Sequence, residues 1–203
     1  MLKLAVLISN AGTGTNLQAI INSIEMGLLK ATVSIVVSSS KDAYGLIRAK
    51  KHNIPTFLLE NNEILENILT DIYKVDYIVL AGWKKIISKS LINSFQNKIL
   101  NLHPGIIPDK IDRVIKNPDG TNGLWNRGKL TNNAIQNFLS NKSTYAGSTV
   151  HYLSNIFDFG IVLARCFEKI NYDDTVESLY SRLKIKENEM YVKTLIKLST
   201  SKG

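Results

Sequence analysis

The residue types best suited to chemistry in this sequence are an amide, an imidazole and a carboxylate: Asn101, His103 and, much further along the chain, Asp158. Segment 98–102 predicts a short strand, and Pro104 must end it because proline donates no ladder hydrogen bond. Asn101 and His103 then lie on the same face at the end of that strand. Such a pair could hold and protonate a carbonyl oxygen that is becoming an oxyanion. The alternative is a polar strand end that satisfies only its own loop.

The loop 9–16, between the first apolar segment and the first helical pattern, is rich in glycine and hydroxyl residues. Its glycines permit a positive φ, so successive backbone N–H groups can face one concavity. The N-terminus of the following helix adds free N–H groups and the positive end of its dipole. Such a loop suits a phosphate, although a tight strand-to-helix turn capped by Thr13 or Thr15 would explain the same residues.

Two familiar phosphate-binding motifs do not match this loop. A dinucleotide fingerprint needs a third glycine where Leu17 stands, and an acidic residue at the end of the second strand, which instead ends in the serines 38–40. A nucleoside-triphosphate loop needs a lysine after its last glycine, and none follows Gly14. The loop therefore indicates a monophosphate rather than a nucleotide cofactor.

Alternating strand and helix patterns fill the first half of the chain. The expected strands are 2–8, 32–38, 55–59, 76–81 and 98–102, and the expected helices are 16–29, 42–52, 61–74 and 88–96. Repeated strand–helix units predict a doubly wound, mainly parallel α/β sheet with helices on both faces. Segment 76–81 is nearly all apolar, as a central parallel strand should be.

The second half of the chain has a different character. Residues 105–130 are rich in Asn, Asp, Gly and Lys with little periodicity, which is typical of a functional lid or a disordered segment. The expected elements beyond it are a helix from Thr131, as N-cap, to Leu139, strands 146–153 and 161–170, and a helix from Asp174 or Thr175 to about Leu198. The late strands form an antiparallel element. We expect one domain over 1–203, with an atypical loop or insert at 109–141.

The composition is that of an ordinary globular protein, with 44% hydrophobic and 21% charged residues in a chain of 203. No apolar run approaches the length of a membrane span, so we expect no membrane partner. The chain enters a strand at once, without a signal or transit pattern, and Cys166 is its single cysteine. These features predict a reducing, cytoplasmic location and no disulfide frame or metal cluster.

The formal net charge of +8 raises the question of nucleic-acid binding. The Lys and Arg residues are dispersed, however, and aromatic residues do not alternate with them. We therefore expect no nucleic-acid partner, but a solvated basic surface that helps to attract an anionic small molecule.

Several pieces of the sequence, in order and spacing, resemble the phosphoribosylglycinamide formyltransferase family, also called glycinamide ribonucleotide transformylases. The pieces are 6–9, 14–21, 36–38, 42–46 with 48–49, 79–83, 99–104, 147–152 and Asp158. The resemblance covers roughly the first hundred residues and the last sixty. It implies a doubly wound sheet and transfer of a formyl group from 10-formyltetrahydrofolate to the amine of phosphoribosylglycinamide, a step of purine biosynthesis.

The resemblance also implies roles for particular residues. The catalytic residues would be Asn101, His103 and Asp158; the substrate-phosphate loop Gly12, Thr13, Gly14, Thr15 and Asn16; the ribose contact Glu187; and the folate site Lys84, Lys85, Ile86, Ile87, Asn155, Ile156 and Phe157. In this mechanism the amide and the protonated imidazole donate to the oxyanion while the carboxylate stabilises the imidazolium. No metal is required, and the chain would act as a monomer or homodimer.

The sequence also departs from the family pattern. Segment 109–141 replaces a Gly- and His-rich substrate segment, and Trp125 within it could stack on a ligand or anchor the loop. Phe159 stands where the family has glycine, and Lys85 where an arginine is common. Two alternatives therefore stay open: a folate-dependent formyltransferase for another amine, such as an amino sugar nucleotide, and a non-catalytic ligand-binding relative.

Overall fold

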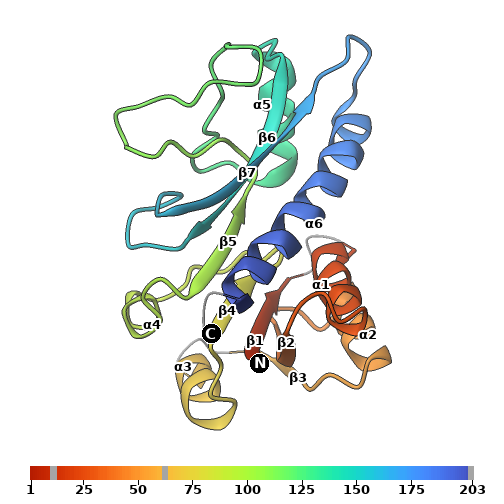
Figure 1. The fold of residues 1–203 in the computed structure, drawn as a ribbon, viewed down its shortest axis with the longest axis vertical. Coiled ribbons are helices and arrows are strands. Elements are labelled where there is room, and N and C mark those ends of the chain that lie inside the picture. The colour runs from red at the N-terminus through yellow and green to blue at the C-terminus, as the bar shows by residue number, and fades with distance from the viewer. Residues whose placement is uncertain (10–12, 61–63, 201–203) are drawn as a thin grey trace. The chain divides into compact units, whose positions relative to one another are not determined.

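The computed structural model describes residues 1–9, 13–60 and 64–200. The chain divides into two compact units (Figure 1). The first unit comprises Met1–Asn101 together with Val192–Gly203, and the second comprises Leu102–Tyr191. Strand β5 and the last helix each run from one unit into the other.

Parallel strands form the centre of the first unit. They are β1 (Leu2–Ile8), β2 (Ala31–Ser38), β3 (Thr56–Leu58), β4 (Tyr77–Leu80) and β5 (Ile99–His103). Strand β1 pairs with β2 and β4, β3 lies outside β2, and β5 lies beside β4, all in parallel. Every residue of β4 is buried, as expected for an apolar parallel strand covered on both faces. The predicted parallel sheet is confirmed.

The helices of the first unit lie between these strands along the chain. They are α1 (Thr15–Glu25), α2 (Tyr44–Lys51), α3 (Leu65–Asn67), which continues into the π-helical turn η2 (Ile68–Ile72), and α4 (Lys89–Ser94). Helix α1 is shorter than predicted because Gly27, at φ 72°, turns the chain soon after Glu25. The Ser88 hydroxyl accepts a hydrogen bond from the Leu91 amide and caps α4. The expected helix 61–74 is in part a π-turn, and its first residues lie outside the described residues.

The second unit contains α5 (Thr131–Ser140), β6 (Tyr145–Tyr152), β7 (Val162–Lys169) and most of α6 (Val176–Thr200). The antiparallel pairing of β6 with β7 confirms the expected antiparallel element. A core cluster that includes Ile135, Phe138 and Leu183 joins α5 to α6. Along the whole sheet the strand order is β3-β2-β1-β4-β5-β6-β7.

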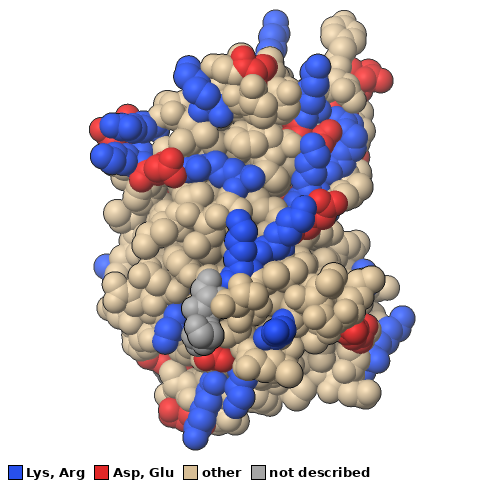
Figure 2. All heavy atoms as spheres, in the orientation of Figure 1, with Lys and Arg blue, Asp and Glu red and all other residues tan. Residues whose placement is uncertain are grey.

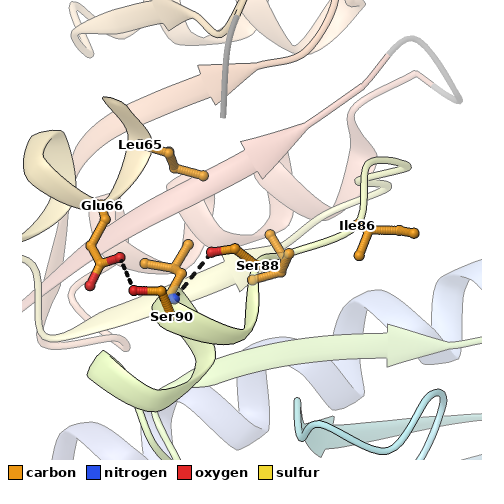
Figure 3. Close-up of a pocket in the computed structure, with 7 residues that line it drawn as sticks. Leu65, Glu66, Ile86, Ser88 and Ser90 are labelled. Atoms are coloured by element: carbon orange, nitrogen blue, oxygen red, sulfur yellow. Dashed lines mark hydrogen bonds between the residues drawn. The ribbon is translucent and has the colours of Figure 1, made fainter. Parts of the chain in front are cut away.

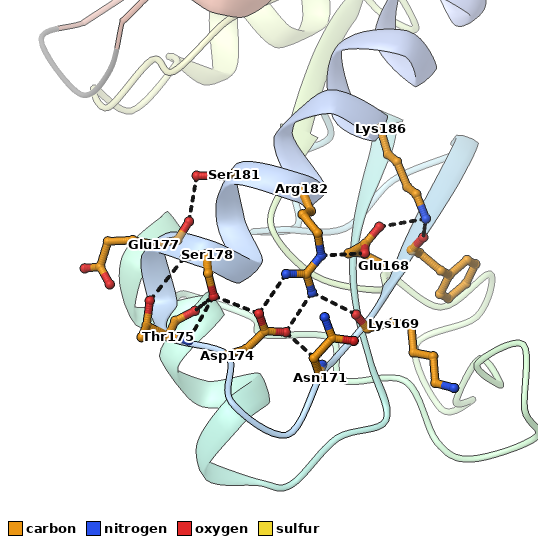
Figure 4. A network of polar contacts seen from close by, with 11 residues as sticks. Glu168, Lys169, Asn171, Asp174, Thr175, Glu177, Ser178, Ser181, Arg182 and Lys186 are labelled. Atoms are coloured by element: carbon orange, nitrogen blue, oxygen red, sulfur yellow. Dashed lines mark hydrogen bonds and ion pairs between the residues drawn. The ribbon is translucent and has the colours of Figure 1, made fainter.

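Two helix starts were predicted from capping residues. Helix α5 begins at Thr131 itself, so its N-cap is Leu130 and the prediction was one residue late. Before α6, the Ser178 amide donates to the Thr175 hydroxyl and the Thr175 amide donates to the Ser178 hydroxyl, a reciprocal capping arrangement that confirms Thr175. The Asp174 carboxylate accepts hydrogen bonds from Arg182 on the second turn of the helix (Figure 4).

Segment 109–141 is ordered by its own hydrogen bonds before α5 begins. Lys116 and Asn122 form an isolated antiparallel bridge around the turn at 118–120. Within it, the Thr121 amide donates to the Asp119 carboxylate at 3.1 Å. The insert therefore has a defined local structure although its sequence lacks periodicity.

Basic side chains form several separate groups on the face drawn in Figure 2, with acidic side chains among them. This distribution agrees with the dispersed Lys and Arg residues of the sequence. None of the described helices combines the length and the apolar character needed to span a bilayer.

Candidate active site

Strand β5 carries the amide and the imidazole that the sequence singles out. Asn101 is half-buried and pairs with Leu80 of β4, and His103, the last residue of the strand, is 2% exposed. The Gly105 amide donates to the His103 carbonyl at 2.9 Å, so the chain turns directly after the strand. The strand ends where Pro104 predicts.

The structure brings the His103 ring and the Asp158 carboxylate together. Nδ1 of His103 lies 3.5 Å from Oδ1 of Asp158, and Nε2 lies 2.6 Å from the Trp125 carbonyl oxygen. Because a carbonyl only accepts, Nε2 must carry a hydrogen. Nδ1 is therefore the nitrogen whose proton can vary, and it faces the carboxylate. The catalytic roles of these residues stay predictions.

The Asp158 carboxylate is held in its charged form by its neighbours. Burial alone would raise its pKa, but the polar contact with His103 and the positive charge of that ring outweigh this effect. The Gly128 amide, which donates to Oδ2 at 2.7 Å, adds to them. Together these contacts hold the pKa of Asp158 below its usual range.

A second imidazole, His151 on β6, is fully buried near this pair. Burial, and then the positive charge of His103, lower the pKa of His151 to about 4. Its Nδ1 lies 3.0 Å from the Tyr152 carbonyl, which can only accept, so Nδ1–H donates there. A ring that is neutral at neutral pH does not compete with His103 as an acid.

Of the two uses considered for Trp125, the contacts in the structure are those of an anchor. Its indole N–H donates to the Asp158 carbonyl at 2.8 Å, and its ring centroid lies 5.7 Å from that of Phe159. The backbone carbonyl of the same residue binds His103. Sequence reasoning missed these backbone partners, because every residue carries a backbone N–H and C=O and residue type gives no signal for them.

The predicted phosphate loop is described in part: Gly12 lies outside the described residues, and Thr13, Gly14, Thr15 and Asn16 lie within them. Gly14 has φ 69°, and a Cβ there would come within 3.0 Å of the Gly45 backbone, so no larger residue fits. Thr15 begins α1. Asn16 is buried, and its Oδ1 has no hydrogen-bond partner within the described part of the chain. Phosphate binding itself stays a prediction.

One residue outside the predicted loop holds it in place. Nε of Arg48 on α2 donates to the Thr13 carbonyl at 2.8 Å, and Nη1 donates to Oε1 of Gln18 on α1 at the same distance. The guanidinium also lies 5.1 Å from the centroid of the Tyr44 ring. Arg48 thus ties the start of α1 to α2, a role that the sequence did not reveal.

Glu187 on α6 is 2% exposed and lies inside the second unit. Its carboxylate accepts from the Ser148 hydroxyl at 2.6 Å and pairs with the Lys184 ammonium at 3.2 Å. Burial would lower the pKa of Lys184, but the charge of Glu187 outweighs it and raises that pKa. Burial, and then the charge of Glu187, raise the pKa of the Cys166 thiol to about 12. The ribose contact of Glu187 stays a prediction.

The first predicted folate segment, Lys84 to Ile87, belongs to the first unit. The Lys84 amide donates to the Ser9 hydroxyl, and the Lys85 ammonium donates to the Leu59 carbonyl at 3.2 Å. Ile86 is 81% exposed, whereas Ile87 is buried. Both line a hollow of about 310 Å³, drawn in Figure 3, whose other lining residues are Leu65, Glu66, Ser88, Ser90 and Leu91.

The second predicted folate segment, Asn155 to Phe157, lies in the turn that ends at Asp158. The Ser154 hydroxyl donates to the Phe159 carbonyl at 2.6 Å and accepts from the Ile156 amide at 3.1 Å, which fixes the turn. Ile156 and Phe157 are 45% and 62% exposed. Apolar side chains left in solvent on an ordered turn are suited to cover a flat ring. No group of three or more His, Cys, Asp or Glu that could hold a metal is found among the described residues.

A mainly parallel sheet ends one strand with an imidazole beside a carboxylate, an arrangement suited to acid–base chemistry in an α/β enzyme. The sequence model described as Formyl transferase matches residues 2–195, and the chain belongs to this family. The predicted family is confirmed.

Named relatives extend this match over nearly the whole chain. Phosphoribosylglycinamide formyltransferase of Haemophilus influenzae is 34% identical over 199 residues, which cover 94% of this chain and 84% of that protein. The enzyme of the same name from Dictyostelium discoideum is 31% identical, with 97% and 98% covered. The solved structure of glycinamide ribonucleotide transformylase 1 from Symbiobacterium toebii is 28% identical, has a TM-score of 0.83, and matches over 99% of this chain and 89% of that chain.

Proposed function

We propose that this protein transfers the formyl group of 10-formyltetrahydrofolate to the amine of phosphoribosylglycinamide, a step of purine biosynthesis. Relatives that match nearly the whole chain are named for this formyl transfer, which supports the proposal. The single observation that supports it within the site is the His103–Asp158 pair at 3.5 Å, with Nε2 of the imidazole engaged by the Trp125 carbonyl.

The chemistry follows from these atoms. The substrate amine attacks the formyl carbon, a C–N bond forms, and the carbonyl oxygen becomes an oxyanion. The Asn101 amide and the Nδ1–H of His103 donate to that oxygen, and the charged Asp158 stabilises the imidazolium. As the bond to the folate nitrogen breaks, Asp158 accepts the proton that the amine loses, directly or through a water, and the folate nitrogen takes up a proton. Each oxyanion donor is worth about 10²–10³ in rate.

The remaining predicted residues bind the two substrates in this proposal. The loop Gly12 to Asn16 holds the phosphate, and Glu187 contacts the ribose. The folate supplies the activated formyl group, and the predicted segments 84–87 and 155–157 bind it. We further propose that 1–203 acts as one formyltransferase domain, in the cytoplasm, as a monomer or homodimer and without a metal.

A transfer assay with the purified protein tests the proposal. We expect formylation of phosphoribosylglycinamide with 10-formyltetrahydrofolate as donor, and loss of at least about 10² in kcat in His103→Gln, because a neutral amide replaces the positively charged donor to the oxyanion. The affinity for a phosphorylated acceptor should stay nearly intact. His52→Gln is the matched control, because the half-buried His52, which contacts Glu25 and Gln18, has no proposed role in catalysis or binding and should leave kcat nearly unchanged.

The acceptor panel separates the alternatives. Formylation of an amino sugar nucleotide alone would assign the chain to another acceptor. Binding of folate and phosphate ligands without turnover would make it a non-catalytic relative. Strong activity in His103→Gln would overturn the role given to the imidazole.

A further inference from the structure

Residues 125–128 of the insert contact both His103 and the turn that carries Asp158. We infer that this segment, which we call the clamp, positions the imidazole and the carboxylate relative to each other, with Trp125 and Arg127 as its positioning side chains. The inference rests on the proposed function for its catalytic meaning. Its contacts all lie within the second unit.

Trp125 contacts both members of the pair. Its carbonyl accepts from Nε2 of His103 at 2.6 Å, while its indole N–H donates to the Asp158 carbonyl at 2.8 Å. One residue thus fixes the ring of the imidazole and the backbone of the carboxylate. A Cβ at Gly105 would lie 1.9 Å from the Trp125 carbonyl oxygen, so the approach of this carbonyl depends on the glycine after Pro104.

Arg127 and Gly128 complete the clamp. Nε of Arg127 donates to the Phe157 carbonyl at 3.0 Å, and its guanidinium lies 5.1 Å from the centroid of the Trp125 ring. The Gly128 amide donates to Oδ2 of Asp158 at 2.7 Å. This bond leaves Oδ1 as the oxygen that faces His103, so the clamp also selects the orientation of the carboxylate.

The turn has a conformation that needs external support. Asp158 has φ 49°, a left-handed conformation that non-glycine residues rarely adopt and that persists where the surroundings hold it. The clamp is itself attached to α5, because the Asn137 amide donates to Oδ1 of Asn126, and the Asn126 amide donates to the Ala134 carbonyl. The insert therefore connects a regular helix to the strained residue.

The distance between the two catalytic groups makes this support matter. At 3.5 Å, Nδ1 of His103 and Oδ1 of Asp158 are slightly farther apart than a normal hydrogen bond. A shift of the turn by a fraction of an ångström would either close this gap or open it. Such a displacement slows the chemical step, because the rate depends steeply on the alignment of the reacting groups. It should leave the binding of both substrates unchanged.

Steady-state kinetics of two variants test the clamp. Trp125→Phe keeps a ring beside Phe159 but removes the indole N–H, and Arg127→Lys keeps the charge but removes the guanidinium Nε donor. We expect kcat to fall about tenfold in the first and several-fold in the second, with both KM values within about twofold of the wild type. Arg113→Lys, an exposed arginine of the same insert, is the matched control and should leave kcat unchanged.

The titration of the Asp158 carboxyl group, followed by NMR, tests the clamp without an activity measurement. The groups whose charge acts on Asp158 are His103 and His151. In Trp125→Phe, ¹³C NMR of labelled carboxyl groups, with Asp158→Asn for assignment, should show the titration of Asp158 moving to higher pH, because the released turn no longer aligns the carboxylate with the Gly128 amide and His103. The low-pH limb of kcat should move in the same direction.

The outcomes are distinguishable. Unchanged kcat and unchanged Asp158 titration in both variants would overturn the clamp, and so would a loss confined to KM. If Trp125→Phe does not fold, Arg127→Lys decides by the same two measurements. If the wild type transfers no formyl group to any acceptor, the proposed function fails, while the NMR titration still decides whether residues 125–128 position Asp158.

Discussion

His151 shows how burial at a single residue determines the response of this protein to pH. The ring is fully buried, and its pKa of about 4 lies well below the usual 6.5 of a histidine. Between these values the unfolded chain binds a proton that the folded protein does not. The free energy of unfolding must therefore rise with pH across this window, and the contribution is complete above the unfolded pKa.

This dependence is measurable by denaturant unfolding between about pH 4 and 7. The size of the shift predicts that His151 alone costs about 3 kcal/mol of stability toward the acid end. His151→Gln, which cannot titrate, should remove that part of the slope whatever it does to the stability itself. A wild-type slope that persists in His151→Gln would show that another group is responsible.

The candidate site combines side chains, which the sequence can suggest by their type, with backbone groups, which it cannot. Asn101, His103 and Asp158 have side chains suited to acid–base chemistry, so the sequence could propose them as candidates, and their catalytic roles stay predictions. The Trp125 carbonyl and the Gly128 amide could not be selected in this way, because the same groups occur at nearly every position. These two backbone groups bind the Nε2–H of the imidazole and orient the carboxylate. They reach these side chains only because distant parts of the chain fold against each other, which residue type does not reveal.

At the scale of elements, most boundaries were predicted to within one or two residues. Strand β1 was placed correctly at both ends, because a parallel strand buried on both faces is a nearly continuous apolar run, interrupted here only by the exposed Lys3. The segment that became α3 and η2 was predicted as one regular helix, since periodicity does not distinguish an α-turn from a π-turn. Helix α1 lost its predicted last turn to Gly27.

The N-terminus of helix α1 allows a test of phosphate binding. Its first turn contains no acidic residue, so its N-terminus keeps the positive potential that would attract a phosphate. Thr15→Asp places a negative charge there. We expect a KM for the phosphorylated acceptor about tenfold higher, because like charges repel, while the KM for the folate stays unchanged. The variant should be as stable as the wild type or slightly more so, since an acidic first turn contributes about 0.3–1 kcal/mol.

Thr15→Asn is the matched control, because it replaces the hydroxyl without adding charge. Weaker acceptor binding together with unchanged or higher stability in Thr15→Asp would indicate a lost phosphate site, whereas lower stability would indicate a damaged helix. An unaltered acceptor KM in Thr15→Asp would mean that the phosphate binds elsewhere.

At the scale of the whole molecule, the fold class was predictable and the internal division was not. Alternating strand and helix patterns predicted the mainly parallel sheet, and the late pair β6–β7 supplied the antiparallel element. The division into two compact units falls within β5, directly after Asn101. Periodicity describes elements one at a time, so it gives no signal for how contacts gather the elements into units.

Net charge is the other property of the whole molecule, and it acts on the rate of encounter with substrate. With a formal charge of +8 spread over dispersed basic side chains, the protein should attract an anionic acceptor from a distance. Salt screens such attraction, because the Debye length falls from about 10 Å at 0.1 M to about 3 Å at 1 M. We therefore expect kcat/KM for phosphoribosylglycinamide to fall several-fold between roughly 0.05 and 0.5 M salt, while kcat changes little. An acceptor that lacks the phosphate is the control and should show a much weaker dependence. Equal salt dependence for the two acceptors would show that the basic surface does not act through the phosphate.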